Sequence, residues 1–101
     1  MAQTDYTEIL KALADRSRMR LVKRLLAGDC IVNDLATALD LSQYNVSKHL
    51  RVLRQAGIVD LRSAGTRREY FIAPKIRDRL DRKGTTLNFG CCTFHLDRLE
   101  N

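Results

Sequence analysis

Hydrophobic residues recur at every third or fourth position over the first half of the chain, which is the period of an amphipathic helix. The pattern predicts four helices, at about residues 5–14, 16–27, 33–39 and 42–56. In the last of them Val46, Leu50 and Leu53 fall on one face and form a stripe that would pack on a core. Only Asp40 and Leu41 separate this helix from the one before it, so a tight turn must join the two.

Polar and small residues stand where these helices should begin and end. Asn33 is expected to cap the third helix and Ser42 the fourth, because both side chains accept hydrogen bonds from the N–H groups of a first helical turn. Leu41 before the second cap and Val46 inside the helix form a predicted hydrophobic staple. Gly57 follows the fourth helix, at a position where a left-handed residue commonly ends one.

The hydrophobic period changes from helical to alternating over residues 58–73, which predicts two antiparallel strands. Residues 63–66, Ser-Ala-Gly-Thr, supply the turn between them. Helix, tight turn, helix and hairpin in this order predict a mainly α fold with a small β-hairpin wing, the winged helix-turn-helix. The prediction assigns residues 1–82 to a DNA-binding domain and leaves residues 83–101 as a cysteine-containing C-terminal tail.

The face of the fourth helix opposite the stripe carries side chains that can read DNA. Gln and Asn amides pair in bidentate fashion with adenine edges, and Lys or Arg binds guanine or phosphate. The predicted DNA contacts on this helix are Ser42, Gln43, Tyr44, Asn45, Ser47, Lys48, His49 and Arg51. His49 lies beside the apolar stripe, so it is expected to touch the backbone or to pack rather than to read a base. Solvation alone also produces a polar helix face, but here that face coincides with a short turn, a staple and a basic wing.

The positive charge of the chain is concentrated in one segment. Residues 42–82 contain ten basic and four acidic side chains, whereas the rest of the chain contains eight of each. The whole formal net charge of +6 therefore lies in the fourth helix, the wing and the segment after it. A concentration of one sign is the electrostatic pattern expected for a polyanionic partner such as duplex DNA.

Length and composition exclude several other classes of protein. At 101 residues the chain fits one small domain, and its 45% hydrophobic content is that of a globular protein. It has no apolar run of about 18 residues and no secretory leader, so we expect a cytoplasmic protein without a membrane span. The sequence has no paired carboxylates at useful spacing, no nucleophile with an orienting base and no glycine-rich phosphate loop, so we predict no enzymatic activity.

Two stretches resemble a known family. ALADRSRMRLV, residues 12–22, and LSQYNVSKHLRVLRQAGIV, residues 41–59, are similar to signatures of the ArsR/SmtB family of bacterial and archaeal repressors, and the resemblance covers about residues 8–73. It implies a homodimer that sits on a near-palindromic operator in double-stranded DNA and releases it when a metal, metalloid or other thiol-reactive inducer binds. No cofactor is then needed for DNA binding itself. The resemblance implies groove contacts from Gln43, Asn45, Ser47 and Lys48, and the predicted wing contacts are Arg62, Thr66, Arg67 and Arg68.

The sequence departs from the family pattern at two places. Arg16 stands where the family signature has proline, which changes the start of a helix. Family members commonly end in a long helix that completes the dimer interface, but here residues 74–82 can form only a short helix before Gly84. Beyond it the apolar residues alternate, with a change of phase at Gly90, which predicts an extended tail with a bend. The broad apolar faces of the first two helices still favour a dimer.

Three cysteines, Cys30, Cys91 and Cys92, form the candidate inducer site. Arsenic-responsive members of the family have C-V-C-D-L at the start of the third helix, whereas this chain has CIVNDL there, so that ligand motif is absent. Three thiolates suit a soft ion, so we predict release by As(III) or another thiophilic metal(loid) if the tail meets Cys30. His95 or Asp97 would complete a zinc-like site, for which adjacent cysteines are a poor arrangement.

Other interpretations of the sequence stay open. A redox or reactive-sulfur sensor would form a disulfide between Cys30 and the tail, or between Cys91 and Cys92, and it needs an exposed thiolate of low pKa. The cysteines can also be small core residues with no sensing role. A winged-helix module that binds proteins instead of DNA is a further alternative, although it would not need the concentrated positive charge. RNA binding is disfavoured because the wing offers few aromatic side chains for stacking bases.

Overall fold

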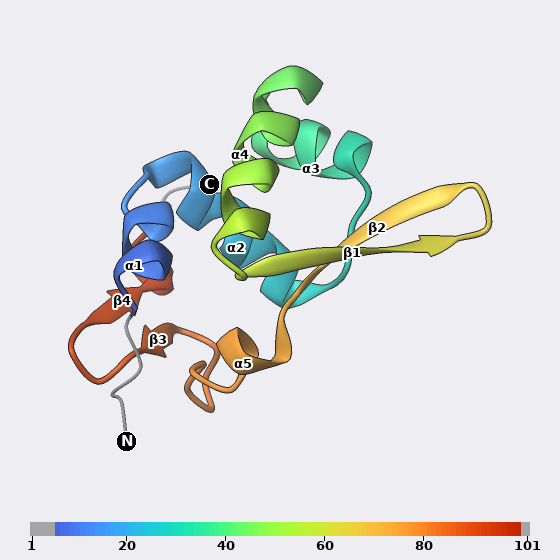
Figure 1. The fold of residues 1–101 in the computed structure, drawn as a ribbon. Helices are drawn as coiled ribbons and strands as arrows, with labels where there is room; N and C mark the ends of the chain where they lie inside the picture. The colour runs from blue at the N-terminus through green and yellow to red at the C-terminus, as the bar shows by residue number, and fades with distance from the viewer. Residues whose placement is uncertain (1–5, 100–101) are drawn as a thin grey trace.

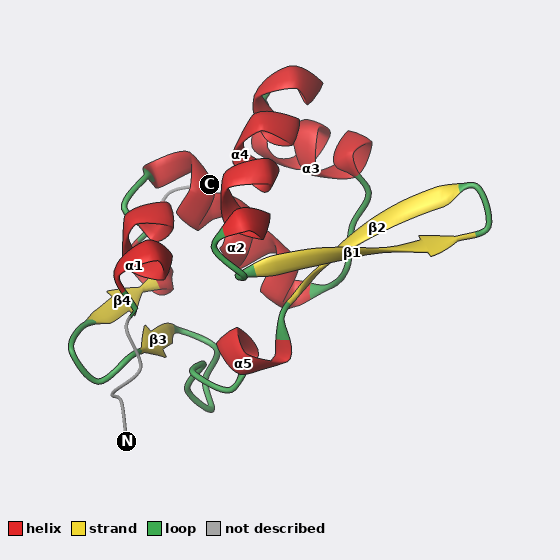
Figure 2. Cartoon of the chain, in the orientation of Figure 1, coloured by secondary structure: helices red, strands yellow, loops and turns green. Residues whose placement is uncertain are grey.

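Leucine and valine side chains from four helices meet in the centre of the molecule. The computed structural model describes residues 6–99. The helices are α1 (Thr7–Leu13), α2 (Arg16–Ala27), α3 (Val32–Leu39) and α4 (Gln43–Gln55), and the hairpin of β1 (Val59–Ala64) and β2 (Arg67–Ile72) projects from them (Figure 1). The chain continues as α5 (Pro74–Arg77), a short hairpin of β3 (Thr86–Asn88) and β4 (Thr93–His95), and the 3-10 turn η1 (Leu96–Arg98) (Figure 2). This order of elements confirms the predicted winged helix-turn-helix.

The core holds α4 against the helices that precede it. Val46, Leu50 and Leu53 have no exposed surface, as the stripe predicts, and they share one apolar cluster with Leu21 and Leu25 of α2. Full burial of a leucine side chain contributes about 1.5–3 kcal/mol, so this stripe fixes which face of α4 points outward. The polar face of the helix is thereby presented to solvent.

The helix ends follow the predicted capping in most places. Ser42 caps α4 as expected, because its Oγ accepts a hydrogen bond from the Asn45 N–H at 3.0 Å. Gly57 follows α4 at a φ of 80°, the left-handed conformation that favours glycine. The predicted cap at Asn33 is wrong: α3 begins at Val32 after Ile31, with no side-chain cap. The side chain of Asn33 is engaged elsewhere, since it accepts a hydrogen bond from Gln43.

The wing is a tight antiparallel hairpin. Its register runs from Val59 opposite Ile72 at the base to Ala64 opposite Arg67 at the tip. The turn therefore contains two residues, Gly65 and Thr66, rather than the predicted four of 63–66. The shorter turn is possible because Gly65 adopts a φ of 67°, and it adds Ser63 and Ala64 to the paired residues of β1.

The tail folds back onto the helices and completes the core. The predicted bend is a hairpin turn around Gly90, and β3 and β4 pair with Leu87 opposite Phe94. Leu87, Phe89 and Leu96 are buried in the same cluster as the helices. The Phe89 ring lies 5.3 Å from the ring of Tyr6, which precedes α1. The tail is thus a packed element of the fold, and not only an extended segment.

Asp81 fastens the start of this hairpin. The sequence predicts a short helix within residues 74–82, but α5 ends at Arg77, and Leu80 pairs with Leu87 of β3. The Asp81 carboxylate accepts hydrogen bonds from the Thr85 hydroxyl at 2.7 Å and from the Thr86 N–H at 3.0 Å. The bond from the Thr85 hydroxyl, followed by that from the Thr86 backbone, lowers the pKa of Asp81 to about 2. The carboxylate therefore stays ionised and holds the turn at neutral pH.

The predicted start of the first helix and the predicted end of the tail lie outside the residues that the structure describes. A first helix is predicted from about residue 5, which lies outside residues 6–99, and α1 begins at Thr7. The last two residues of the predicted tail, 100 and 101, also lie outside this range. Within the described range no helix is both long and apolar enough to cross a membrane.

Candidate nucleic-acid interface

The outward face of α4 is polar along its whole length. The exposed residues of this face are Gln43, Tyr44, Asn45, Ser47, Lys48 and Arg51, and Ser42 is exposed at the cap. Tyr44 is 75% exposed and is the one exposed large hydrophobic side chain among the described residues. A shallow hollow of about 200 Å³ lies between Tyr44, Ser47, Lys48 and Arg51. Amides, hydroxyls and cations thus cover the outward face of a single helix, and a single helix is the element that fits a major groove.

A short connection sets the angle between α3 and α4. Asp40 adopts a left-handed φ of 55°, and the Leu41 N–H donates to the Ala36 carbonyl at 3.0 Å. The side-chain amide of Gln43 in α4 donates to the side-chain oxygen Oδ1 of Asn33 in α3. The first turn of α4 is therefore tied to α3 by both backbone and side-chain bonds.

His49 is turned away from the polar face. It is half-buried, and its Nδ1 lies 3.5 Å from Nη1 of Arg18 on α2. Arg18 in turn pairs with Asp15, with 3.6 Å between Nη1 and Oδ2. The position of His49 agrees with its expected packing role beside the stripe. Its inclusion among the DNA contacts stays a prediction.

The wing arginines lie in two different environments. Thr66, Arg67 and Arg68 are exposed at the tip, and the pairing pattern places Arg67 and Arg68 on opposite faces of the hairpin. Arg62 is nearer the base, where it forms an ion pair with Asp29 and lies 4.8 Å above the ring of Phe71. Two partners already hold the Arg62 guanidinium, so it supports the wing in addition to any contact with DNA.

The base of the wing is joined to the segment between α2 and α3. The Cys30 N–H donates to the Tyr70 carbonyl at 3.2 Å, and the Tyr70 N–H donates to the Cys30 carbonyl at 2.8 Å. This two-bond bridge and the Asp29 pair hold the wing beside the helix-turn-helix. The bridge was not predicted from the sequence, because backbone pairing between residues so far apart has no local signal.

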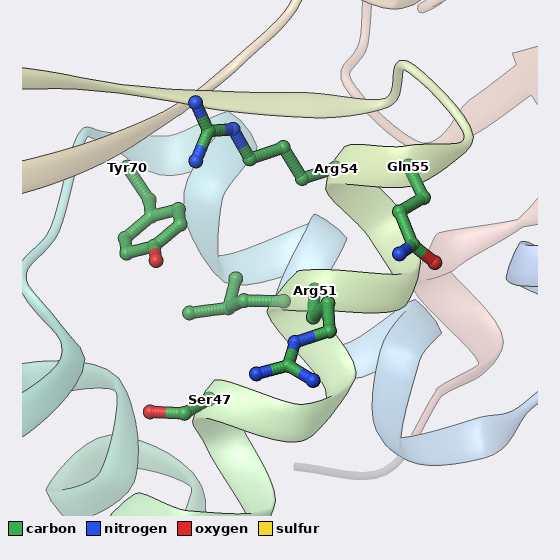
Figure 3. A pocket seen from close by; sticks show the side chains of 6 residues that line it. Ser47, Arg51, Arg54, Gln55 and Tyr70 are labelled. Atoms are coloured by element: carbon green, nitrogen blue, oxygen red, sulfur yellow. The ribbon is translucent and has the colours of Figure 1, made fainter.

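A larger hollow, of about 690 Å³, separates the second half of α4 from the wing. Its lining includes Ser47, Arg51, Arg54 and Gln55 of α4, and Figure 3 shows the Tyr70 ring of β2 across from Ser47, Arg51 and Arg54. Arg54, Gln55 and Tyr70 were not among the site residues predicted from the sequence. A signal existed for two of them, since Gln55 and Arg54 follow Arg51 at helical spacings of four and three.

Comparison with known proteins agrees with this geometry. Residues 15–60 match the family model described as bacterial regulatory protein, arsR family. The HTH-type transcriptional regulator Rv2034 of Mycobacterium tuberculosis is 45% identical over 76 residues, which cover 71% of each chain. The chain belongs to the ArsR family. The arsenical resistance operon repressor of Escherichia coli is 40% identical over 70 residues, which cover 68% of this chain and 60% of that repressor.

A solved structure shares the ArsR-family fold. The homodimeric winged helix-turn-helix DNA-binding domain Mb0332 of Mycobacterium bovis superposes with a TM-score of 0.68 at 32% identity, covering 78% of this chain and 82% of that one. The protein is therefore a DNA-binding transcriptional regulator of the ArsR family and not an enzyme, as the sequence predicts.

The cysteines of this ArsR-family chain lie in two places. Cys30 is buried at the wing base, where burial raises the pKa of its thiol. Cys91 is exposed and Cys92 is half-exposed in the turn of the tail hairpin, and burial followed by a hydrogen bond with Cys91 raises the pKa of Cys92. Within residues 6–99 no group of three His, Cys, Asp or Glu side chains is placed to hold a metal ion. A single subunit thus brings the adjacent pair together but does not bring Cys30 to it.

Proposed function

We propose that this ArsR-family regulator is a homodimeric repressor that binds a near-palindromic operator with α4 in the major groove and the wing beside the groove. The observation that supports this most directly is that both the polar face of α4 and the arginines of the wing tip are exposed. The hydrogen-bonded connections of α4 to α3, and of the wing base to Cys30, favour a preformed interface. Operator DNA in a bacterium lies in the cytoplasm, so we assign the protein to that compartment.

A dimer is supported by the related domain Mb0332, which is described as homodimeric. Two-fold symmetry would place two α4 helices about one DNA turn apart, roughly 34 Å, on matching half-sites. Phe89 and Leu96 of the tail cover part of the helices of their own chain. The dimer contact of this protein would therefore differ from one made by a long C-terminal helix.

Arg67→Ala is expected to weaken binding to operator and random DNA alike, because an arginine at the exposed wing tip would contact phosphates, which carry no sequence information. The dependence of log Kd on log salt should flatten by about one unit. Fluorescence anisotropy with labelled DNA from the protein's own promoter and with scrambled DNA measures both effects.

Arg98→Ala is the matched control, since Arg98 is exposed on η1 at the tail and carries the same charge. An equal loss for Arg98→Ala would mean that net charge, and not the wing, determines affinity. Absence of any DNA binding by the unchanged protein would favour the alternative of a winged-helix module that binds proteins.

We further propose that the inducer is a thiophilic metal(loid) of the As(III) type, captured first by the pair Cys91 and Cys92. Arsenous acid, As(OH)₃, can condense with two thiols to give a dithiolate and two water molecules, and soft sulfur ligands favour such an ion. A third thiolate from Cys30 would require that residue to leave the core. Its bridge to Tyr70 would then be disturbed, and the wing would lose its attachment. The wing would then be attached at Cys30 in the free protein and detached in the inducer-bound protein. A regulatory switch needs two such states that differ in their affinity for DNA.

The redox alternative is less well supported by the thiols of the chain. A redox-sensing cysteine needs an exposed thiolate of low pKa. The pKa of the buried Cys30 is raised, as is that of Cys92, and both groups are therefore protonated at neutral pH. We keep disulfide formation as the second candidate, because Cys91 is exposed.

Cys91→Ser is expected to leave operator affinity unchanged but to blunt the response to inducer. The measurement is a titration of As(III) into the reduced protein bound to promoter DNA, followed by anisotropy. Stoichiometric release that disappears in Cys91→Ser, and also in Cys30→Ser, would support the three-thiolate switch. Release by peroxide, reversed by a reductant, with no response to As(III), would instead favour the redox sensor. An unchanged As(III) response in Cys91→Ser would remove the tail from the mechanism.

A further inference from the structure

We propose that the hollow between α4 and the wing holds a phosphodiester of the DNA strand that runs between them, bound by Arg54 and the hydroxyl of Tyr70. This inference rests on the proposed operator binding and adds a contact that neither the sequence nor the family comparison assigns. The hollow measures about 690 Å³, with Ser47 and Arg51 at one end and Arg54 and Tyr70 at the other.

The lining has the chemistry of an anion site. Arg51 and Arg54 contribute two guanidinium groups, and both side chains are exposed. The hydroxyls of Ser47 and Tyr70 can each donate one hydrogen bond. Figure 3 shows the guanidinium groups of Arg51 and Arg54 and the Tyr70 ring arranged around the same space. The fully buried Leu50 lies at its floor and is apolar, so the charged groups stand at the rim where a backbone phosphate can reach them.

Asp60 positions Arg54 without occupying all of its donors. The Arg54 Nε lies 3.2 Å from Oδ1 of Asp60 at the start of β1. The same Oδ1 accepts a hydrogen bond from the Leu61 N–H at 2.8 Å, which fixes the carboxylate. A guanidinium has five N–H donors in a planar fork, so the two terminal nitrogens of Arg54 remain available for a phosphate.

The position of the hollow favours a DNA strand over a free small anion. Ser47 and Arg51 line both this hollow and the smaller one on the outward face of α4, so the two surfaces are continuous. The backbone that borders a major groove passes beside any helix inserted in it. With the wing on the far side of that backbone, the strand would have to run through the gap between α4 and β2. The side chains of Arg51 and Arg54 give this gap a positively charged lining.

The Tyr70 side chain also connects this contact to the fold. Its backbone is bridged to Cys30 and its side chain is half-buried, so the ring has less conformational freedom than an exposed side chain would have. An ordered donor costs less conformational entropy on binding than a flexible lysine would. Arg54 therefore supplies charge to the site, and Tyr70 supplies a fixed hydrogen bond.

The test compares Arg54→Gln, Tyr70→Phe and the control Arg98→Gln in DNA binding at several salt concentrations. Arg54→Gln should weaken operator and random DNA by about tenfold, because a charge-assisted bond is lost. It should also reduce the slope of log Kd against log salt by about 0.9. Tyr70→Phe keeps the ring and its packing, and it should weaken both DNAs by about fivefold with an unchanged salt slope. Arg98→Gln should behave as the unchanged protein does.

Operators with single neutral methylphosphonate linkages locate the contact. One linkage beside each half-site should weaken binding of the unchanged protein and leave the affinity of Arg54→Gln as it was. Near-normal binding of Arg54→Gln and Tyr70→Phe, with Arg67→Ala still weakened, would overturn this inference and leave the proposed function standing. If the unchanged protein binds no DNA, the proposed function fails and this contact fails with it.

Discussion

Replacing Phe89 with alanine is expected to lower the free energy of unfolding by about 3–5 kcal/mol, the range for removing a buried aromatic ring. Phe89 is 4% exposed, although it lies in the turn of a short hairpin. Its ring contacts Tyr6 at 5.3 Å and stands edge-on to Phe94 at 6.1 Å, distances at which aromatic pairs attract. A small domain has a total stability of only about 5–15 kcal/mol, so this one change removes a large part of it.

Urea unfolding followed by circular dichroism measures the effect, with Thr93→Ala as the matched control. Thr93 lies on β4 of the same hairpin but is exposed, so its loss should change stability by less than about 0.5 kcal/mol. A small change in the free energy of unfolding for Phe89→Ala would mean that the tail packs loosely on the helices and contributes little to the core. An unchanged slope with denaturant would confirm that the two variants unfold from comparable states.

Replacing Gln43 with alanine is expected to cost about 1–3 kcal/mol of binding at the operator and little on random DNA. Gln43 stands in the first turn of α4, where its side chain is exposed. Its amide nitrogen donates to Asn33, and the second hydrogen on that nitrogen stays free. An amide held in this way presents one acceptor and one donor, which match the edge of adenine.

The affinities of each variant for operator DNA and for random DNA, measured side by side, test this prediction. Asn45→Ala should show a loss of the same kind, since Asn45 is exposed on the next position but one of α4. Asn33→Ala should reproduce a part of the Gln43 effect, because it frees the Gln43 amide to rotate. Equal losses on both DNAs for these variants would mean that α4 does not read bases and that the reading element lies elsewhere.

The sequence predicted those parts of the fold that local signals specify. The stripe of Val46, Leu50 and Leu53 has helical spacing, and a period of this kind is enough to orient α4. The Ser42 cap and Gly57 mark its two ends through the chemistry of single residues. The same spacing places the polar residues of α4 on its exposed face. The candidate base contacts could therefore be predicted from the sequence alone.

Other features depend on residues that are far apart and could not be predicted locally. Asn33 is as good a cap as Ser42 by residue type, but its amide bonds Gln43 of the next helix instead. Arg62 is one basic residue among several in the sequence, and only the fold reveals Asp29 beside it. Alternation in the tail predicted an extended segment with a bend, but not its pairing into a hairpin or the return of Phe89 to Tyr6. The hollow beside α4 is lined by residues of both α4 and β2, so neither element alone could predict it.

Contacts of the C-terminal part of the chain with Tyr6 and with α2 affect how the protein folds as it is made. A stretch of 73 residues separates Arg79 from its hydrogen-bond partner Tyr6, and 76 separate Leu99 from Lys23. Contacts of such long sequence separation form late, because a long loop must close first. While the chain leaves the ribosome, α1, α2, α3 and α4 can pack on one another, but Tyr6 and part of the apolar cluster of the helices stay uncovered until Phe89 and Leu96 emerge. Nascent chains without the tail should therefore be the species that chaperones bind and proteases cleave.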